Sequence, residues 1–239
     1  MTYYDVDWSP RFDFGGPRST SGLKGVCVHT SEGNPSITAE NLANYQLTSQ
    51  TGSYHVIVDL TGKRLRENTD DWITWSSGNQ GNNILLHICF TARADWTRQQ
   101  WLDQHKMLYA GATVVAHWCK TYGFPARKVD TRSLPGILGH DDTRAWGGTD
   151  HTDPGKNFPY DVFAQMVNDA LNPSTNPGGP VATDKLTDVH QKVMGRYKSR
   201  VPGSTYEDDM LGYIHQIDKA VYEQGQQLKR IEDLLKGGK

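Results

Sequence analysis

The sequence predicts an α/β fold, in which a central mixed β-sheet carries helices packed on its faces, followed by a small all-helical C-terminal tail. Over residues 25–171, short apolar runs alternate with longer segments of helical periodicity, as in domains built from one sheet covered by helices. Residues 172–183 contain three prolines and no charge, which is typical of a linker. We therefore expect a domain large enough to hold a catalytic site over 1–171, a linker over 172–183 and a helical module over 184–239.

The expected strands are short and lie in the first half of the chain. Residues 25–29 alternate along the chain and are rich in valine. Residues 53–60 form a second strand, which ends at the turn-forming pair Thr61-Gly62, and residues 63–67 return as the other arm of a hairpin. Residues 84–90 are almost continuously apolar, as expected for a strand buried on both faces.

Three helices are expected between and after these strands. Residues 37–48 form the first, with Thr38 as its N-cap. Residues 97–122 form one long helix, which Gly123 ends. Residues 159–171 form the last, because their apolar side chains fall on one face.

The tail has helical spacing of its own. Apolar residues from Leu186 to Tyr197 predict one helix, and Ser204 and Glu207 have the spacing of a capping box that begins another. A heptad repeat follows over 210–235, interrupted at Gln224 and Gly225. Its core positions are Met210, Ile214, Ile217, Val221, Gln224, Leu228, Ile231 and Leu235. Two interpretations stay open: a coiled coil that joins copies of the chain, or a stripe that packs on the rest of the same chain.

Composition excludes several classes of protein. The 25 Lys and Arg residues balance 27 Asp and Glu residues, so there is no basic excess for binding nucleic acid. Three cysteines are an odd number, so they cannot all pair in a disulfide framework. The first residues lack the basic and apolar segments of a signal peptide, and the apolar run 107–119 is too short to cross a bilayer. We expect synthesis in the cytoplasm and no membrane span.

Three residues at the ends of rigid segments have the chemistry of metal ligands. His29 ends the first strand, His140 follows the apolar segment that closes with Leu138-Gly139, and Asp153 precedes the turn-forming Pro154-Gly155. Two imidazoles and a carboxylate suit Zn²⁺ with its fourth position open. The residues alone leave packing roles open for each, because no HExxH helix presents both histidines.

Five motifs in a fixed order resemble the zinc-dependent N-acetylmuramoyl-L-alanine amidases of type 2, which share the fold of peptidoglycan recognition proteins and include phage endolysins. The motifs are Val26-Cys-Val-His29, Ser53-Tyr-His55 followed by Asp59-Leu-Thr-Gly62, the strand Asn82 to Phe90, Gly139-His140, and His151-Thr-Asp-Pro-Gly155. The resemblance covers about residues 25–171. It implies that His29, His140 and Asp153 bind Zn²⁺ and that the chain cleaves the amide between N-acetylmuramic acid and L-alanine in bacterial peptidoglycan.

The resemblance also implies roles in catalysis. Zn²⁺ lowers the pKa of a water molecule that it binds and polarises the scissile carbonyl. Tyr54 falls where phage members of the family carry a tyrosine beside this water, so its hydroxyl is expected to orient the water or to stabilise the oxyanion. His151 falls where relatives often carry lysine and is expected to donate to the oxyanion. Packing roles are the alternative for both residues.

Two departures from the family pattern affect the site. His87 stands where some bacterial members carry a glutamate proposed as proton carrier, so the general base is either His87 or a combination of Tyr54 and the metal. Residues 73–76 read Ile-Thr-Trp-Ser where relatives often have Trp-His-Ala. Trp75 is therefore expected to offer a flat apolar surface to the substrate, with Asn82 as a second substrate contact.

The sequence leaves three functions open. The first is a phage endolysin, present in the cytoplasm of the infected host cell until it is released to the cell wall, with a tail that either joins copies of the chain or targets the wall. The second is a peptidoglycan-binding module of the same fold without catalysis, which the presence of all three expected ligands disfavours. The third is another zinc hydrolase, acting on a small recycled muropeptide in the cytoplasm, for which the long tail has no use.

Overall fold

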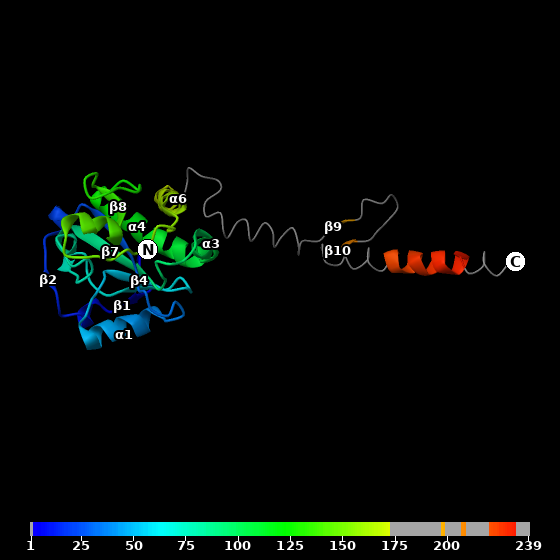
Figure 1. Cartoon of the computed structure of the whole chain (residues 1–239), viewed down its shortest axis with the longest axis horizontal. Coiled ribbons are helices and arrows are strands. Elements are labelled where there is room, and N and C mark those ends of the chain that lie inside the picture. The colour runs from blue at the N-terminus through cyan, green and yellow to red at the C-terminus, as the bar shows by residue number, and fades with distance from the viewer. Residues whose placement is uncertain (1, 173–196, 199–206, 209–219, 233–239) are drawn as a thin grey trace. The chain divides into compact units, whose positions relative to one another are not determined.

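The computed structural model describes residues 2–172, 197–198, 207–208 and 220–232 (Figure 1). The chain divides into two compact units, Met1–Gly179 and Pro180–Lys239.

A six-stranded mixed sheet forms the centre of the first unit, in the order β1-β5-β4-β7-β3-β8. Strands β4 and β5 are antiparallel, and the other neighbouring pairs are parallel. The predicted fold class is confirmed. The strands are β1 (Val6–Asp7), β3 (Gly25–Thr30), β4 (Val56–Val58), β5 (Arg64–Arg66), β7 (Leu85–Phe90) and β8 (Gly136–Gly139), and a separate antiparallel pair joins β2 (Gly16–Pro17) to β6 (Trp72–Ile73).

Helices cover the two faces of this sheet (Figure 1). Side chains of β4 alternate between them: Ile57 packs in a cluster with Ala39 and Ala43 of α1, whereas Val56 and Val58 pack in the cluster that contains the apolar faces of α4 and α6. Strands β3 and β7 are buried along their whole length. The helices are α1 (Ala39–Ser49), α2 (Gly81–Ile84), α3 (Arg98–Asp103), α4 (His105–Tyr122), α5 (His140–Thr143) and α6 (Tyr160–Leu171), with short 3₁₀ turns at Ser9–Arg11, Thr20–Gly22 and Arg144–Trp146.

The single helix predicted over 97–122 is wrong, because α3 and α4 are separate helices. The chain breaks at Gln104, whose φ of −92° and ψ of 40° lie outside the helical region. Trp101 of α3 is fully buried, with its ring centroid 4.9 Å from that of Phe158 and 6.1 Å from that of Phe90. This large side chain thus anchors α3 to the core beside the sheet, a contact that helix propensity does not reveal.

The parallel arrangement of β3, β7 and β8 positions the site. His29 lies near the carboxyl end of β3, and His140 directly follows the carboxyl end of β8. Because β3 pairs with β8 in parallel, from Gly25 opposite Gly136 to Val28 opposite Gly139, these two ends meet at one edge of the sheet. Ligands bind at this edge in open α/β sheets.

The second unit contains a helix over 220–232, in agreement with the predicted helical tail. The tail is not all helical, however, because β9 (Tyr197–Lys198) pairs antiparallel with β10 (Glu207–Asp208). Glu207 is therefore in a strand, and the helix start predicted at Ser204 to Glu207 is wrong. The turn-forming pair Pro202-Gly203 between the two strands is a sequence signal that favours such a pairing.

Part of the predicted tail lies outside the described residues, including most of the helix expected from Leu186 to Tyr197 and the ends of the heptad repeat. Among the residues that the structure describes, no helix has the length and apolar character needed to cross a membrane.

Candidate active site

The three predicted metal ligands meet at the sheet edge. Asp153 Oδ2 lies 3.2 Å from His29 Nδ1, and Asp153 Oδ1 lies 3.1 Å from His140 Nδ1. All three side chains are buried, and each offers a ligand atom within 4.8 Å of the others. Residues from three distant parts of the sequence therefore form one cluster.

The backbone holds each member of this cluster in place. His29 is fixed by strand β3, which pairs on both sides, and His140 begins helix α5. The Thr30 amide donates a hydrogen bond to Asp153 Oδ2 at 3.2 Å, and the Asp141 amide donates to the Asp153 carbonyl at 3.0 Å. The aspartate is thus tied to the same two segments that carry the histidines.

The donor set fits a metal ion. His29 Nδ1 and Asp153 Oδ1 are buried and have no hydrogen-bond partner among the described residues, which is costly unless another group satisfies them. Burial lowers the pKa of His29. Burial alone would raise the pKa of Asp153, but the imidazoles of His140 and His29 beside the carboxylate hold that pKa below its ordinary range. The neutral imidazole and ionised carboxylate are the ligand forms, and two histidines with one carboxylate match a catalytic Zn²⁺ site with an open position.

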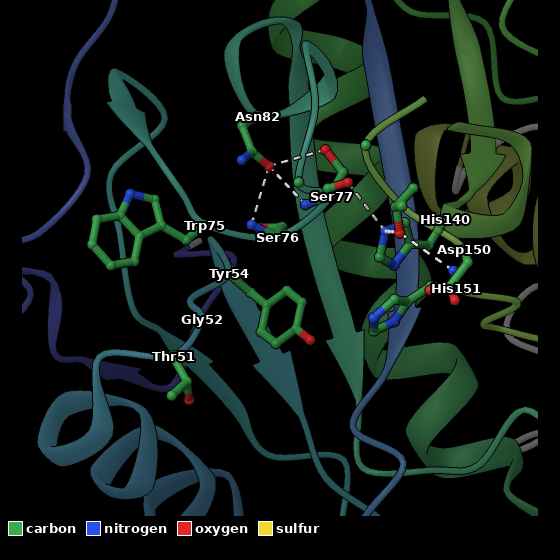
Figure 2. A pocket seen from close by; sticks show the side chains of 13 residues that line it. Thr51, Gly52, Tyr54, Trp75, Ser76, Ser77, Asn82, His140, Asp150 and His151 are labelled. Atoms are coloured by element: carbon green, nitrogen blue, oxygen red, sulfur yellow. Dashed lines mark hydrogen bonds between the residues drawn. The ribbon is translucent and has the colours of Figure 1, made fainter. Parts of the chain in front are cut away.

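A pocket of about 490 Å³ opens beside the cluster, and both His140 and His151 line it (Figure 2). The His151 ring stacks on the His140 ring with centroids 4.7 Å apart, and His151 Nδ1 lies 3.4 Å from Asp153 Oδ1. The His151 side chain is 60 % exposed. It is therefore next to the ligands and accessible to a substrate.

Tyr54 lies on the other side of the cluster. Its ring centroid is 5.1 Å from that of His29, and in Figure 2 its hydroxyl points toward the part of the pocket that carries His140 and His151. Burial raises the pKa of Tyr54 well above its ordinary value. The hydroxyl therefore keeps its proton and is available as a hydrogen-bond donor.

Trp75 and Asn82 differ in how they meet the pocket. The Trp75 side chain is 45 % exposed at the pocket, and its ring packs 5.0 Å from that of Phe14. Asn82 Oδ1 accepts hydrogen bonds from the amides of Ser76 and Ser77, at 3.1 and 2.7 Å, and from Ser77 Oγ at 2.9 Å (Figure 2). Asn82 thus shapes the loop after Trp75, and only its amide nitrogen remains for a substrate.

The family model that matches residues 19–156 is described as N-acetylmuramoyl-L-alanine amidase. The match spans more than half of the chain. The chain belongs to this amidase family. The resemblance stated from the sequence motifs is confirmed, and the family activity is amide hydrolysis in peptidoglycan.

One solved structure shows the same fold at low sequence identity, and two others are more distantly similar. The hydrolase AmiA of Staphylococcus aureus, in a crystal structure with its ligand, has a TM-score of 0.58 and 18% identity, over 71% of this chain and 84% of that one. PlyL has a TM-score of 0.49 and 19% identity, over 70% and 97%. The endolysin N-acetylmuramoyl-L-alanine amidase LysCS of Clostridium intestinale has 0.46 and 14%, over 68% and 94%. No curated protein sequence matches this chain significantly.

In this amidase, His87 lies outside the pocket. It is fully buried behind His29, with its Nδ1 2.9 Å from His29 Nε2 and its Nε2 3.1 Å from the Gly81 carbonyl. Burial lowers the pKa of His87 well below its ordinary value. Of the two general bases that the sequence left open, His87 is therefore the one that does not line the pocket.

Two residues near the site carry no signal in the sequence. Thr149 Oγ1 lies 3.1 Å from His140 Nε2, so it helps to orient that ring. The partly buried Arg18 donates to the carbonyls of Asn82 and Leu85, at 3.0 and 2.8 Å, and ties the pocket loop to strand β7. Both residues make hydrogen bonds to groups that lie elsewhere in the sequence. A threonine or an arginine in a loop does not by itself indicate which group it contacts.

Proposed function

We propose that this family member hydrolyses the amide between the lactyl group of N-acetylmuramic acid and the L-alanine of the stem peptide, with Zn²⁺ held by His29, His140 and Asp153. The observation that carries the proposal is the pair of orphaned buried atoms, His29 Nδ1 and Asp153 Oδ1, in a cluster of three ligand groups beside an open pocket. A bound Zn²⁺ would act as a Lewis acid on the carbonyl and lower the pKa of a water molecule.

The residues around the cluster divide the remaining work. Tyr54 contacts the His29 side of the cluster, and His151 contacts the His140 side. Addition of water to the carbonyl carbon places negative charge on its oxygen, which Tyr54 stabilises by donating a hydrogen bond. The C–N bond then breaks, and the departing L-alanine nitrogen takes the proton that the water molecule gives up. The exposed His151, at the pocket and beside the ligand set, would carry this proton from the water to the nitrogen.

Trp75 and its loop bind the rest of the substrate. The exposed face of Trp75 is backed by Phe14, so the ring is held in place before a substrate arrives. Such a rigid aromatic surface suits the apolar face of a sugar ring. The amide nitrogen of Asn82 is a second contact from the same wall.

The product of digestion tests the activity. Purified protein acting on isolated peptidoglycan should release stem peptides with free L-alanine amino termini and leave the saccharide chains intact, as seen by mass spectrometry. Chelation should abolish the reaction, and added Zn²⁺ should restore it. New reducing ends would instead identify a glycosidase, and an inert protein that still sediments with cell walls would identify a binding module.

A matched pair of histidine variants tests the ligand assignment. His140→Ala should lose bound zinc and activity together, because it removes one of three ligands. His105→Ala changes a histidine on α4 outside the site and should keep both. Full metal content and activity in His140→Ala would contradict the assignment.

The finer biological role is that of a phage endolysin, held in the cytoplasm of an infected host and released to the wall. The family and the expected organisation into a domain over 1–171, a linker over 172–183 and a module over 184–239 support it. Production inside a bacterium should leave the culture intact until a membrane-permeabilising agent is added, after which turbidity should fall within minutes. Growth unaffected by permeabilisation would argue against this role.

Self-association through 210–235 is the proposed function of the tail. Val221, Leu228 and Ile231 follow heptad spacing on the helix over 220–232 and are 61 %, 63 % and 53 % exposed, which leaves their apolar face for a second copy of the chain. Leu228→Asp should halve the mass seen by light scattering after gel filtration, and Gln226→Asp on the same helix should not. A wild-type monomer would refute the proposal.

A further inference from the structure

A chain of three groups runs from the metal cluster into the protein interior. It begins at His29, whose Nδ1 faces Asp153 and whose Nε2 lies 2.9 Å from His87 Nδ1. It continues from His87 Nε2 to the Gly81 carbonyl oxygen at 3.1 Å. Both imidazoles are fully buried, so no solvent molecule competes for these hydrogen bonds.

The Gly81 carbonyl determines which ring nitrogen carries the proton in His87 and in His29. A carbonyl oxygen only accepts, so His87 must carry its proton on Nε2 and present the lone pair of Nδ1 to His29. His29 must then donate from Nε2, which leaves the lone pair of its Nδ1 directed at the cluster. That lone pair is the one a metal ion requires.

The opposite assignment fails at both ends. With its proton on Nδ1, His87 would direct the lone pair of Nε2 at the oxygen of Gly81 and donate to His29 Nε2. A neutral His29 would then carry its own proton on Nδ1, in the position of the metal. The hydrogen-bond acceptor at Gly81 therefore selects the tautomer of His29 that binds a metal.

The backbone holds His87 and Gly81 in register. The His87 amide donates to His55 Nδ1 at 3.0 Å, and His87 lies opposite Cys27 in the pairing of β7 with β3. Gly81 begins α2 and packs closely, since a Cβ there would lie 2.6 Å from Ser77 Oγ. Ser77 lines the pocket, so the hydrogen bonds from His29 through His87 end at Gly81, next to the pocket wall.

We propose that His87 is a positioning residue of the metal centre. It fixes the tautomer and orientation of His29 by accepting a hydrogen bond from His29 Nε2 while it donates one from its own Nε2 to the Gly81 carbonyl. The role replaces that of proton carrier, because His87 does not reach the pocket. It rests on the proposed function, in which His29 is a zinc ligand. Loss of such an outer partner lowers metal affinity by about 10- to 100-fold.

Three substitutions separate the two hydrogen bonds of His87. His87→Asn places its side-chain oxygen near the position of Nδ1 and keeps an acceptor for His29. His87→Gln places its amide near the position of Nε2 and keeps the donor to Gly81 but loses the acceptor. His87→Leu loses both. We expect zinc affinity, measured by competition with a chromophoric chelator, to fall about 10- to 100-fold in the Leu and Gln variants and by less than about 3-fold in the Asn variant.

The same proteins distinguish positioning from proton transfer. Fully loaded with zinc, all three variants should keep kcat within a few-fold of wild type, whereas loss of a general base lowers kcat by about 10²- to 10⁴-fold even in the loaded enzyme. Nitrogen-15 NMR of the wild-type protein should show the His29 proton on Nε2. Far-ultraviolet circular dichroism of the Asn and Gln pair, which differ little in size, checks that each is folded.

Each result then has one meaning. Unchanged zinc affinity in the Leu and Gln variants, an equal loss in all three, or a collapse of kcat in the loaded enzymes would overturn the positioning role. Failure of the proposed function is separate, because it would appear as absence of zinc binding in the wild-type protein. His105→Ala, outside the site, should match wild type in every measurement.

Discussion

Replacement of Gly155 by alanine should damage the metal site through the backbone, without touching a ligand. Gly155 has φ of +89°, and a Cβ built there would lie 2.0 Å from the Ala94 carbonyl oxygen and 2.8 Å from the Ala94 carbonyl carbon. Contacts under 3.0 Å are essentially never seen for a real Cβ, and the opposing atoms belong to the backbone. The turn that carries Asp153 must therefore move away from Ala94.

Gly123, at the C-terminal end of α4, is the matched control. Its φ is +73°, but a Cβ there would meet nothing within 4 Å. Both alanine variants adopt a left-handed conformation, which costs about 1–2 kcal/mol. Only Gly155→Ala adds the steric overlap, for which about 1–3 kcal/mol is typical. We expect the free energy of unfolding to fall by about 2–5 kcal/mol in Gly155→Ala and by about 1–2 kcal/mol in Gly123→Ala.

Urea unfolding of the metal-free proteins measures this difference, and chelator competition measures zinc affinity. Asp153 precedes Gly155 by two residues, and its carbonyl accepts from the Asp141 amide, so displacement of the turn should lower zinc affinity in Gly155→Ala alone. Equal stability losses in the two variants would refute the steric reasoning. Unchanged zinc affinity in a destabilised Gly155→Ala would show that the turn does not position Asp153.

Three further perturbations test the pocket and its support. Burial raises the pKa of Glu67 well above its ordinary value of 4.5, so the free energy of unfolding should fall as pH rises above that value, by up to about 1.4 kcal/mol per pH unit. Glu67→Gln should flatten this slope in urea unfolding between pH 5 and 8, and an unchanged slope would show that Glu67 does not cause it. Trp75→Ala should raise KM for peptidoglycan fragments about 2- to 12-fold, from stacking of about 0.5–1.5 kcal/mol, with kcat nearly unchanged; Trp75→Phe should keep most of the affinity, and equal losses in both would exclude stacking. Asn82→Ala should cost about 1–3 kcal/mol, because it leaves two loop amides unpaired, whereas Asn82→Asp keeps the accepting oxygen; no loss of stability in Asn82→Ala would show that the loop does not depend on it.

The parts of the site that the sequence predicted are those with a local signal. His29 was recognisable because an apolar strand ends beside it, and Asp153 because Pro154 and Gly155 mark a turn. The break between α3 and α4 shows the limit of such signals: the helical pattern continues past Trp101, but the backbone leaves the helical region at Gln104, and Trp101 packs against the distant Phe158. A side chain that packs against a distant segment leaves no periodic trace in its own neighbourhood.

Residue order determined the central strands β3, β4, β5 and β7, the helices α1 and α6 and the chemical types available for the site, because hydrophobic periodicity and turn residues act over a few neighbouring positions. Tertiary structure alone decided which of these groups meet. The parallel pairing of β3 with β7 and β8 brings His29 to His140 and places His87 behind it. Parallel strands are joined by long crossover connections, so no local sequence pattern sets their register. The Gly81 carbonyl can therefore select the tautomer of His29 only after the sheet has formed.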